Sequence, residues 1–293
     1  MAFRTKLVRS ETLIPAAINL HPGRIYTRVE LAESFRRLRR EGALAKATTL
    51  DEFIDFLVLR RHLISVLLES KEYSKEAKRY CAGPPSPFAL AASLRKNGYL
   101  SHGTAAYLHK LTKAPPAAIY LNVEQSVKAA GNSSLSQLAI DRAFAGKQRH
   151  SKLSYENGDL KVTILAGKNT GRLGVEPTAH PEALGTKVTN LERTLIDITV
   201  RPDYAGGIHQ VLDAFKAARE QVSPHALASI LDQLNYSYPY AQAIGFLMSR
   251  ASYRADSLEP FRSRVSQFKF HLAHGTKNPA YNEDWKLFIP KGL

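Results

Sequence analysis

Two helix-start signals of the same kind, a threonine followed three residues later by a glutamate, stand close together near the beginning of the chain. Thr27 precedes Glu30, and Thr49 precedes Glu52. In such a capping box each of the two residues binds the other's backbone N–H through its side chain, which fixes where the helix begins. Apolar residues then recur at helical spacing after each box. They are Leu31, Phe35 and Leu38 after the first, and Phe53, Ile54, Leu57 and Val58 after the second. The sequence therefore predicts two short amphipathic helices.

A β-hairpin is predicted after these helices. Residues 63–68 and 78–81 favour strands, and the polar run 69–76 is predicted to connect them. Upstream, residues 13–20 are predicted to form a short helix and residues 24–26 a brief extended piece. The order helix, short strand, helix, turn, helix, hairpin is typical of a winged helix-turn-helix. That fold places one helix in the major groove of DNA and lets the hairpin touch the backbone.

A proline-rich segment at residues 83–87 is predicted to be the domain boundary, because proline and glycine punctuate structure. A chain of 293 residues with 44% hydrophobic content can form two folded parts with cores of their own. We therefore expect an α+β protein with an N-terminal winged helix-turn-helix domain over residues 1–83. A larger mixed α/β domain is expected over residues 84–293.

The second part opens with a strand, a helix and a strand in residues 99–120, a βαβ-like arrangement. Ser101 is predicted to cap the helix, and Pro115 and Pro116 end it. Asn157-Gly158 predicts a tight hairpin turn. Thr189 and Glu192 are predicted to cap a further helix. Other helices are expected at residues 88–96 and 136–144, after Gly207, after Ser223 and at 240–252, and strands at 268–272 and 285–289.

The charge of the chain favours a polyanionic partner. The formal net charge is +15, and residues 1–80 alone hold 16 Lys and Arg against 10 Asp and Glu. A field of this sign attracts nucleic acid in a salt-dependent way. The predicted DNA-binding residues are Arg36, Arg37, Arg39, Arg40, Thr49, Arg60, Arg61, Lys71, Lys75 and Lys78, with Leu50 and Glu52 as further base readers. A second basic surface is predicted at Arg142, Lys147, Arg149, Lys152, Lys161, Lys168 and Arg172, with solubility as its alternative meaning.

Several kinds of chemistry are not supported. Cys81 is the only cysteine, so no intrachain disulfide is expected. The run 167–171 is not a phosphate-binding loop, because Val162 stands where that motif has its first glycine and Asn169, not Ser or Thr, follows the lysine. The pairs His102 with His109 and His271 with His274 are interpreted as structural, so neither a metal nor another cofactor is expected. The chain has no apolar run that would span a bilayer and no signal-peptide pattern at its start, which leads us to expect a cytoplasmic protein.

One enzyme hypothesis stays open, a metal-dependent nuclease. Its carboxylates would hold a divalent cation at the scissile phosphate and a lysine would assist the attacking water. The residues that could supply this set are Asp141, Glu156, Asp159 and Lys161. The spacing is weak evidence, because Asp159 is also explained as a turn residue. We expect a protein that is not an enzyme.

Six strings together resemble the AbiEi-type antitoxins of type IV toxin–antitoxin (abortive infection) systems. They are SPFALAASL from Ser86, YLSHGTAAYLHKLT from Tyr99, IYLNVEQ from Ile119, VTNLERTLID from Val188, YAGG from Tyr204 and YPYAQAIGF from Tyr238. The resemblance covers most of the chain from Ser86 onward. One departure is Lys110, which stands where the family usually has glycine.

The resemblance implies a non-enzymatic protein with two roles. Its N-terminal winged helix would bind inverted repeats in its own operator on double-stranded DNA and repress transcription. Its C-terminal body would counteract a cognate toxin similar to nucleotidyltransferases, directly or indirectly. Two alternatives remain, a protein-binding neutraliser that acts by direct contact through residues 84–293, and an RNA-binding protein.

Overall fold

The computed structural model describes residues 7–20, 23–127 and 135–293 and divides the chain into two compact units. The first unit comprises residues 1–96 together with 154–161, and the second comprises 97–153 and 162–293. The predicted boundary at residues 83–87 therefore lies inside the first unit. There Ser86 caps the helix α5 (Pro87–Ser93), whose Ser93 accepts a hydrogen bond of 3.0 Å from the Arg79 side chain.

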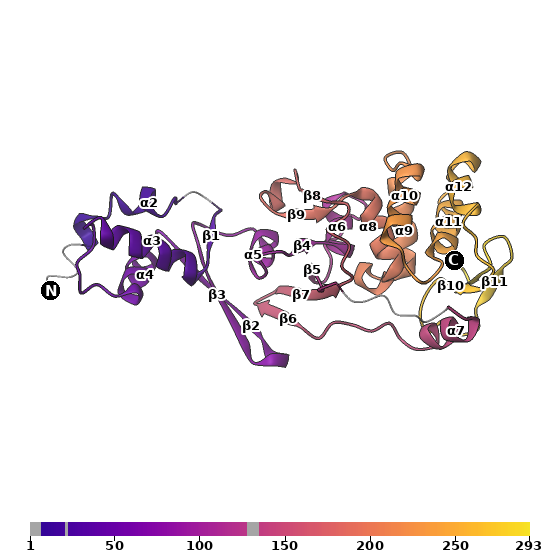
Figure 1. Ribbon diagram of the computed structural model, residues 1–293, viewed down its shortest axis with the longest axis horizontal. Helices are drawn as coiled ribbons and strands as arrows, with labels where there is room; N and C mark the ends of the chain where they lie inside the picture. The colour runs from indigo at the N-terminus through magenta and orange to yellow at the C-terminus, as the bar shows by residue number, and fades with distance from the viewer. Residues whose placement is uncertain (1–6, 21–22, 128–134) are drawn as a thin grey trace. The chain divides into compact units, whose positions relative to one another are not determined.

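Short helices, a hairpin and two further strands make up the described part of the first unit. The elements are α2 (Ile14–Ala17), β1 (Ile25–Tyr26), α3 (Arg28–Arg40), α4 (Leu50–Leu59), β2 (Ile64–Ser70), the 3-10 turn η1 (Lys71–Tyr73), β3 (Lys75–Cys81), α5 and β6 (Ser154–Asn157). Both predicted capping boxes are present, with each threonine bound to the backbone N–H of its glutamate. The predicted apolar residues Leu31, Phe35, Phe53 and Leu57 lie in one core. The α-helices α2, α3 and α4 gather at one end of this unit (Figure 1).

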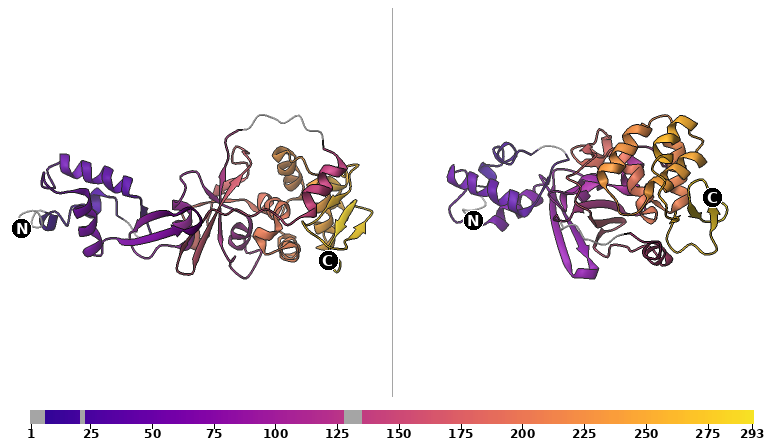
Figure 2. Two further views of the ribbon diagram at one scale, coloured as in Figure 1. Left: turned by 90° about the horizontal axis from the view of Figure 1, so that it is seen from below. Right: turned by 45° about the vertical axis from the view of Figure 1, so that its right-hand side comes forward.

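The hairpin is longer than the sequence predicted. Strands β2 and β3 pair in antiparallel register from Ile64 opposite Cys81 to Ser70 opposite Lys75, so both ends of the polar run 69–76 are strand and only its middle is the turn. The turn closes at Ser74, which has a left-handed φ of 47°. The polarity of this run was misleading because residues of a projecting hairpin are solvated while their backbones still pair. Figure 2 shows the hairpin as a long two-stranded ribbon.

The second unit contains a sheet, several helices and a small additional sheet. Its sheet runs β7-β5-β4-β9-β8, with β4 (Tyr99–Leu100), β5 (Ile119–Glu124), β7 (Leu160–Gly167), β8 (Val175–Pro177) and β9 (Lys187–Thr189). Its helices are α6 (His102–Leu108), α7 (Gln137–Ala145), α8 (Leu191–Val200), α9 (Ile208–Ala218), α10 (Pro224–Leu234), α11 (Tyr240–Arg250) and α12 (Ala255–Arg262), with 3-10 turns η2 (Pro181–Ala183) and η3 (Pro202–Ala205). The small sheet has the order β10-β12-β11, from β10 (Phe270–His271), β11 (Ala280–Asn282) and β12 (Leu287–Ile289). The fold is α+β, as predicted.

Two predictions about the stretch 99–120 are wrong. Strands β4 and β5 pair antiparallel, so the arrangement is not a βαβ unit, for which a seven-residue helix is also too short. Ser101 makes no side-chain cap; its hydroxyl lies 2.9 Å from His102 Nδ1 instead. The helix ends in a left-handed residue, Lys110, with a φ of 59°, and the N–H of Leu111 bonds back to Ala106 over 2.8 Å. This is the Schellman ending that favours glycine, which accounts for the glycine usual in the resembled family.

The predicted cap of α8 is also wrong. Asn190 caps this helix by accepting from the N–H of Arg193 over 2.9 Å. Glu192 accepts from the N–H of Ser223, and Thr189 pairs with Thr194 at 2.8 Å. Asn190 stands one residue closer to the helix than Thr189 and occupies the N-cap position. Its short polar side chain therefore reaches the free N–H of Arg193, which the Thr-Glu spacing alone did not predict. Helix α12, which carries an internal proline, was not predicted.

Three of the resembled strings meet at one place in the second unit. Helix α6, from the string that begins at Tyr99, packs against α8 and η3, from the strings at Val188 and Tyr204. A Cβ added to Gly103 would lie 2.5 Å from the backbone carbonyl oxygen of Tyr204, so only glycine permits this approach. These strings therefore encode close backbone packing.

Candidate functional site

The first unit carries a cationic hollow beside the last turns of α3. It has a volume of about 460 Å³ and is lined by Arg36, Arg39, Arg40 and Lys46. The three arginines share one face because residues three and four apart on a helix are neighbours. Lys46 joins them because Arg39 donates a hydrogen bond to the backbone carbonyl of Lys46, which holds the α3–α4 loop against the helix. Three of these four cations were predicted DNA contacts; Lys46 was missed.

The other predicted contacts in this unit are exposed on neighbouring elements. Arg37 follows Arg36 on α3, and Arg61 ends α4 with a left-handed φ of 59°. Arg60 packs over the Phe56 ring and lies 3.7 Å from Glu11. On the hairpin, Lys71 lies 3.7 Å from Glu156, while Lys75 and Lys78 lie over the rings of Tyr73 and Tyr80. Their charges remain accessible to solvent.

The beginning of α4 is acidic, but two of its carboxylates are engaged locally. Asp51 forms an ion pair of 2.5 Å with Arg28, which lowers the pKa of Asp51. Glu52 accepts from the backbone N–H and the hydroxyl of Thr49, and these bonds lower the pKa of Glu52. The side chain of Thr49 is thereby held at the N-terminus of α4. The ion pair with Arg28 offsets the repulsion that Asp51 would exert on a phosphate, whereas Glu52, bonded to a neutral residue, keeps its charge.

The second basic surface is divided between the two units. Lys161 belongs to the first unit, where it lies 3.4 Å from Glu156. The other six residues belong to the second. Of these, Lys147 and Arg149 line one cavity and Lys168 lines another. Arg172 is half-buried over the Tyr99 ring and donates to the carbonyl of Asn97, while Arg142 and Lys152 are exposed.

A buried ion pair lines the smaller of these cavities, which has a volume of about 130 Å³. The side chains of Arg193 and Asp197 are 5% and 6% exposed and form an ion pair of 2.8 Å. Burial opposes the charge of Arg193, but contact with Asp197 outweighs it and raises the pKa of the guanidinium. His102 is buried against the same cavity, and burial lowers its pKa to about 4, so its imidazole is neutral at pH 7. The sequence signal for the pair was opposite charges four residues apart within an apolar helix.

The larger cavity, of about 480 Å³, adjoins the smaller one through Val200, Arg201 and Tyr236, which line both. Its walls come from the end of α7, the end of α8 and the connection between α10 and α11. Its charged lining residues are the cations Lys147, Arg149 and Arg201, and its aromatic ones include Phe144, Tyr236, Tyr238, Tyr240 and His274. The sequence predicted two of the cations and none of the rings, which are far apart along the chain.

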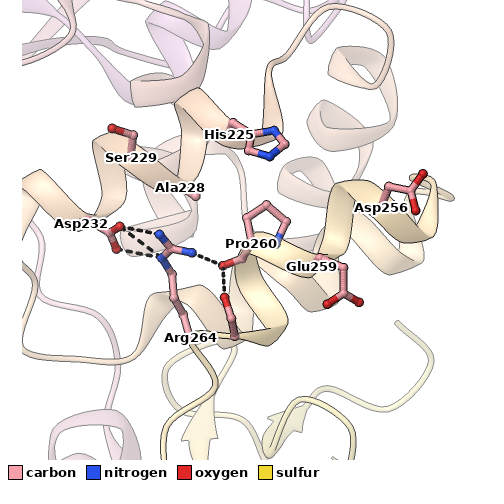
Figure 3. Close-up of a pocket in the computed structure, with 9 residues that line it drawn as sticks. His225, Ala228, Ser229, Asp232, Asp256, Glu259, Pro260 and Arg264 are labelled. Atoms are coloured by element: carbon pink, nitrogen blue, oxygen red, sulfur yellow. Dashed lines mark hydrogen bonds and ion pairs between the residues drawn. The ribbon is translucent and has the colours of Figure 1, made fainter.

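A third hollow of the second unit lies between α10 and α12 and has a structural explanation. Figure 3 shows Arg264 turned toward Asp232 and Pro260. Its guanidinium binds both carboxylate oxygens of Asp232, at 2.6 Å from Nη2 and 2.9 Å from Nε at the shortest, and also donates to the Pro260 carbonyl. This pairing lowers the pKa of Asp232. The best-placed charged groups of this hollow therefore connect the two helices.

The residues of the nuclease hypothesis do not form one cluster in either unit. Asp141 belongs to the second unit, where it contacts His271 at 2.9 Å and Gln137 at 3.0 Å. Glu156 and Asp159 belong to the first. In the part of the chain that the structure describes, no group of three or more His, Cys, Asp or Glu side chains could hold a metal ion. Both His271 and His274 stack on the Phe144 ring.

The fold and these surfaces define a basic α+β protein of two units. A crystal structure of the RV2827C protein from Mycobacterium tuberculosis has a similar fold, with a TM-score of 0.58 over 97% of this chain and 91% of that one. The two sequences are 16% identical, so the similarity concerns the fold alone. No protein-family model and no curated protein matches the chain. Among the described residues, no helix has the length and apolar character needed to cross a membrane.

Proposed function

We propose that the protein is a DNA-binding transcriptional repressor of its own operon and the antitoxin of a type IV toxin–antitoxin system. The observation that carries the DNA-binding part is the cationic hollow of Arg36, Arg39, Arg40 and Lys46. Four cations around one concave surface concentrate positive charge where it can neutralise several phosphates of a nucleic-acid backbone. The order of helices and hairpin in this unit supports a winged helix-turn-helix.

The position of the hollow leads us to assign the main DNA contacts to α3 and not to α4. The predicted base readers Leu50 and Glu52 stand at the beginning of α4, yet the solvent-facing residues of this helix include three acids, Asp51, Glu52 and Asp55. The cations lie on α3 and on the loop that follows it. We therefore assign the phosphate contacts to the end of α3 and to the hairpin lysines. Base reading by the beginning of α4 is assigned a smaller role.

The test is a salt titration of duplex binding by the full chain. Binding of a duplex from the region upstream of the gene is measured from 50 to 200 mM salt, for the wild type and for Arg36→Gln with Arg40→Gln. Arg39 is left in place because it also holds the α3–α4 loop. Each lost phosphate contact reduces the slope of log K against log salt by about 0.9, so the double variant is expected to lose about 1.8.

A matched control removes two cations at the end of α9 in the second unit, Lys216 in its last turn and Arg219 just after it. Lys216→Gln with Arg219→Gln changes the net charge equally, and both side chains are exposed. This variant is expected to keep the slope of the wild type. Equal slopes for all three proteins would remove α3 from the interface.

The antitoxin part rests on the resemblance of the second unit, in which three of the six strings pack together. Growth is measured in cells that express the protein encoded beside this chain, with and without each variant. The variant changed at Arg36 and Arg40 is expected to lose repression and to keep neutralisation. Loss of both activities together would contradict the division of labour. Co-purification of the two proteins decides whether neutralisation uses direct contact.

A further inference from the structure

The 480 Å³ cavity of the second unit combines cations with aromatic rings in one lining. Lys147, Arg149 and Arg201 are exposed at the cavity, whereas the Tyr236 and Tyr238 rings are half-buried. Its volume falls within the range of roughly 300–1,000 Å³ that is usual for small-molecule sites. Flat rings beside cations are the arrangement with which proteins hold a nucleobase and its phosphate.

An unsatisfied donor gives independent evidence for a ligand. The Gln148 side chain is 6% exposed and lines this cavity. Its Oε1 accepts from the backbone N–H of Asp203 at 3.5 Å, whereas its Nε2 has no hydrogen-bond partner in the described structure. The Nδ1 atom of His274, in the same lining, is a second buried atom that lacks a partner among the described residues. Buried polar atoms are almost always bonded, so two unpaired atoms among the residues that line one cavity are an unusual feature, and a polar occupant would account for it.

The rings that line the cavity are held in place by their neighbours. Phe144 stacks on His274 with centroids 4.2 Å apart and meets Tyr238 edge-on at 5.4 Å. Tyr240 meets Tyr236 at 5.4 Å and 75°. A platform that is already rigid loses little conformational entropy when a flat ligand binds.

We propose that this cavity binds a nucleotide, with its base against Tyr236 and Tyr238, its phosphate near Arg201 and Lys147, and a base acceptor facing Gln148 Nε2. The chemistry is shared by a free nucleoside monophosphate and by the terminal nucleotide of a single-stranded nucleic acid. Nucleotide binding at this cavity is distinct from duplex binding by the first unit, because every residue of the cavity lies in the second unit.

The test uses the full chain and titration calorimetry with the four ribonucleoside 5′-monophosphates, inorganic phosphate, uridine and a six-residue single-stranded RNA. Saturable binding of a monophosphate, tighter than that of uridine or phosphate alone, is expected. A free nucleotide as the ligand predicts that the RNA binds no tighter than the monophosphate. An RNA end predicts tighter binding of the oligonucleotide.

Three variants probe the three parts of the site. Arg201→Gln is expected to weaken monophosphate binding on the order of tenfold, because a charge-assisted contact is lost. Tyr238→Leu is expected to weaken uridine and monophosphate alike, and Gln148→Leu to reduce the difference between bases. Arg254→Gln, outside the cavity, serves as control, and thermal unfolding checks that each variant is folded.

Two results would overturn the proposal. One is the absence of saturable binding of any monophosphate or of the RNA at millimolar concentration. The other is binding that Arg201→Gln and Tyr238→Leu leave unchanged while both remain folded. Duplex binding is measured in parallel, and Arg201→Gln is expected to leave it as in the wild type, so failure here is distinguishable from failure of the first unit's function.

Discussion

Replacing Asp197 by asparagine should destabilise the second unit far more than an equivalent change on its surface. The variant leaves the buried guanidinium of Arg193 without its counter-charge. Two other acceptors remain, the carbonyl of Leu173 at 2.9 Å and the hydroxyl of Thr170 at 3.3 Å, but both are uncharged. Breaking a buried ion pair by removing one partner costs about 3–5 kcal/mol. That is a large part of the total stability of about 5–15 kcal/mol that is typical of a domain.

A surface pair of nearly the same length provides the comparison. Lys216 and Asp213 on α9 lie 2.9 Å apart with side chains 53% and 65% exposed, against 2.8 Å for the buried pair. Asp213→Asn should therefore cost only about 0–1 kcal/mol, since exposed pairs are screened by solvent. The contrast depends on burial and not on distance.

The assay is urea unfolding followed by far-UV circular dichroism, fitted for two units because a single two-state transition is not expected. With a slope of about 2 kcal/mol per molar urea, a loss of 3 kcal/mol lowers the midpoint of one transition by about 1.5 M. The double change Arg193→Met with Asp197→Leu should recover much of the loss, because no uncompensated charge remains. Equal midpoints for Asp197→Asn and Asp213→Asn would refute the reasoning.

Two further predictions concern α6. Burial lowers the pKa of His102 to about 4, below its ordinary value near 6.5, so the unfolded state binds the proton first. Stability should therefore fall by about 3 kcal/mol as the pH drops from 6.5 to 4. In urea unfolding at several pH values, His102→Asn should remove this dependence of stability on pH, whereas the exposed His209→Asn should keep it. If the dependence survives in His102→Asn, other titrating groups cause it. Lys110→Gly should raise the free energy of unfolding by about 1 kcal/mol, because it relieves a left-handed backbone, whereas Lys113→Gly should give no gain. A loss of stability in Lys110→Gly would mean that the lysine side chain makes a contact worth more than the strain.

The parts of the fold that could be predicted from the sequence are those governed by local chemistry. The boxes at Thr27 and Thr49 were confirmed because a cap involves groups only three residues apart. The turn at Gly158 could be predicted for the same reason, because the glycine itself permits the positive φ of 56° that this turn requires. Helix α12 was missed because Pro260 lies inside it, and an internal proline ordinarily argues against a helix.

The candidate sites were predicted only where one segment carries them. Arg36 and Arg40 could be found because they lie together on one helix. The second cavity could not, because Gln148, Arg201 and Tyr238 come from three segments whose meeting depends on tertiary packing. Because Lys161 and Lys147 are close in a basic part of the sequence, we predicted that they share one surface. In the structure Lys161 belongs to the first unit and Lys147 to the second. Proximity in sequence is a poor guide wherever a chain crosses between units.

That crossing affects how the protein is made. The first unit takes its strand β6 from residues 154–161, more than fifty residues beyond Lys96. Until those residues leave the ribosome, β2 has an open edge where β6 will pair, at Glu69 opposite Glu156. At roughly 5–20 residues per second, the delay after Lys96 is synthesised is roughly 3 to 13 s. During that interval the nascent hairpin is exposed to wrong strand pairing, and the first unit can be completed only after residues 97–153 of the second unit have also been synthesised.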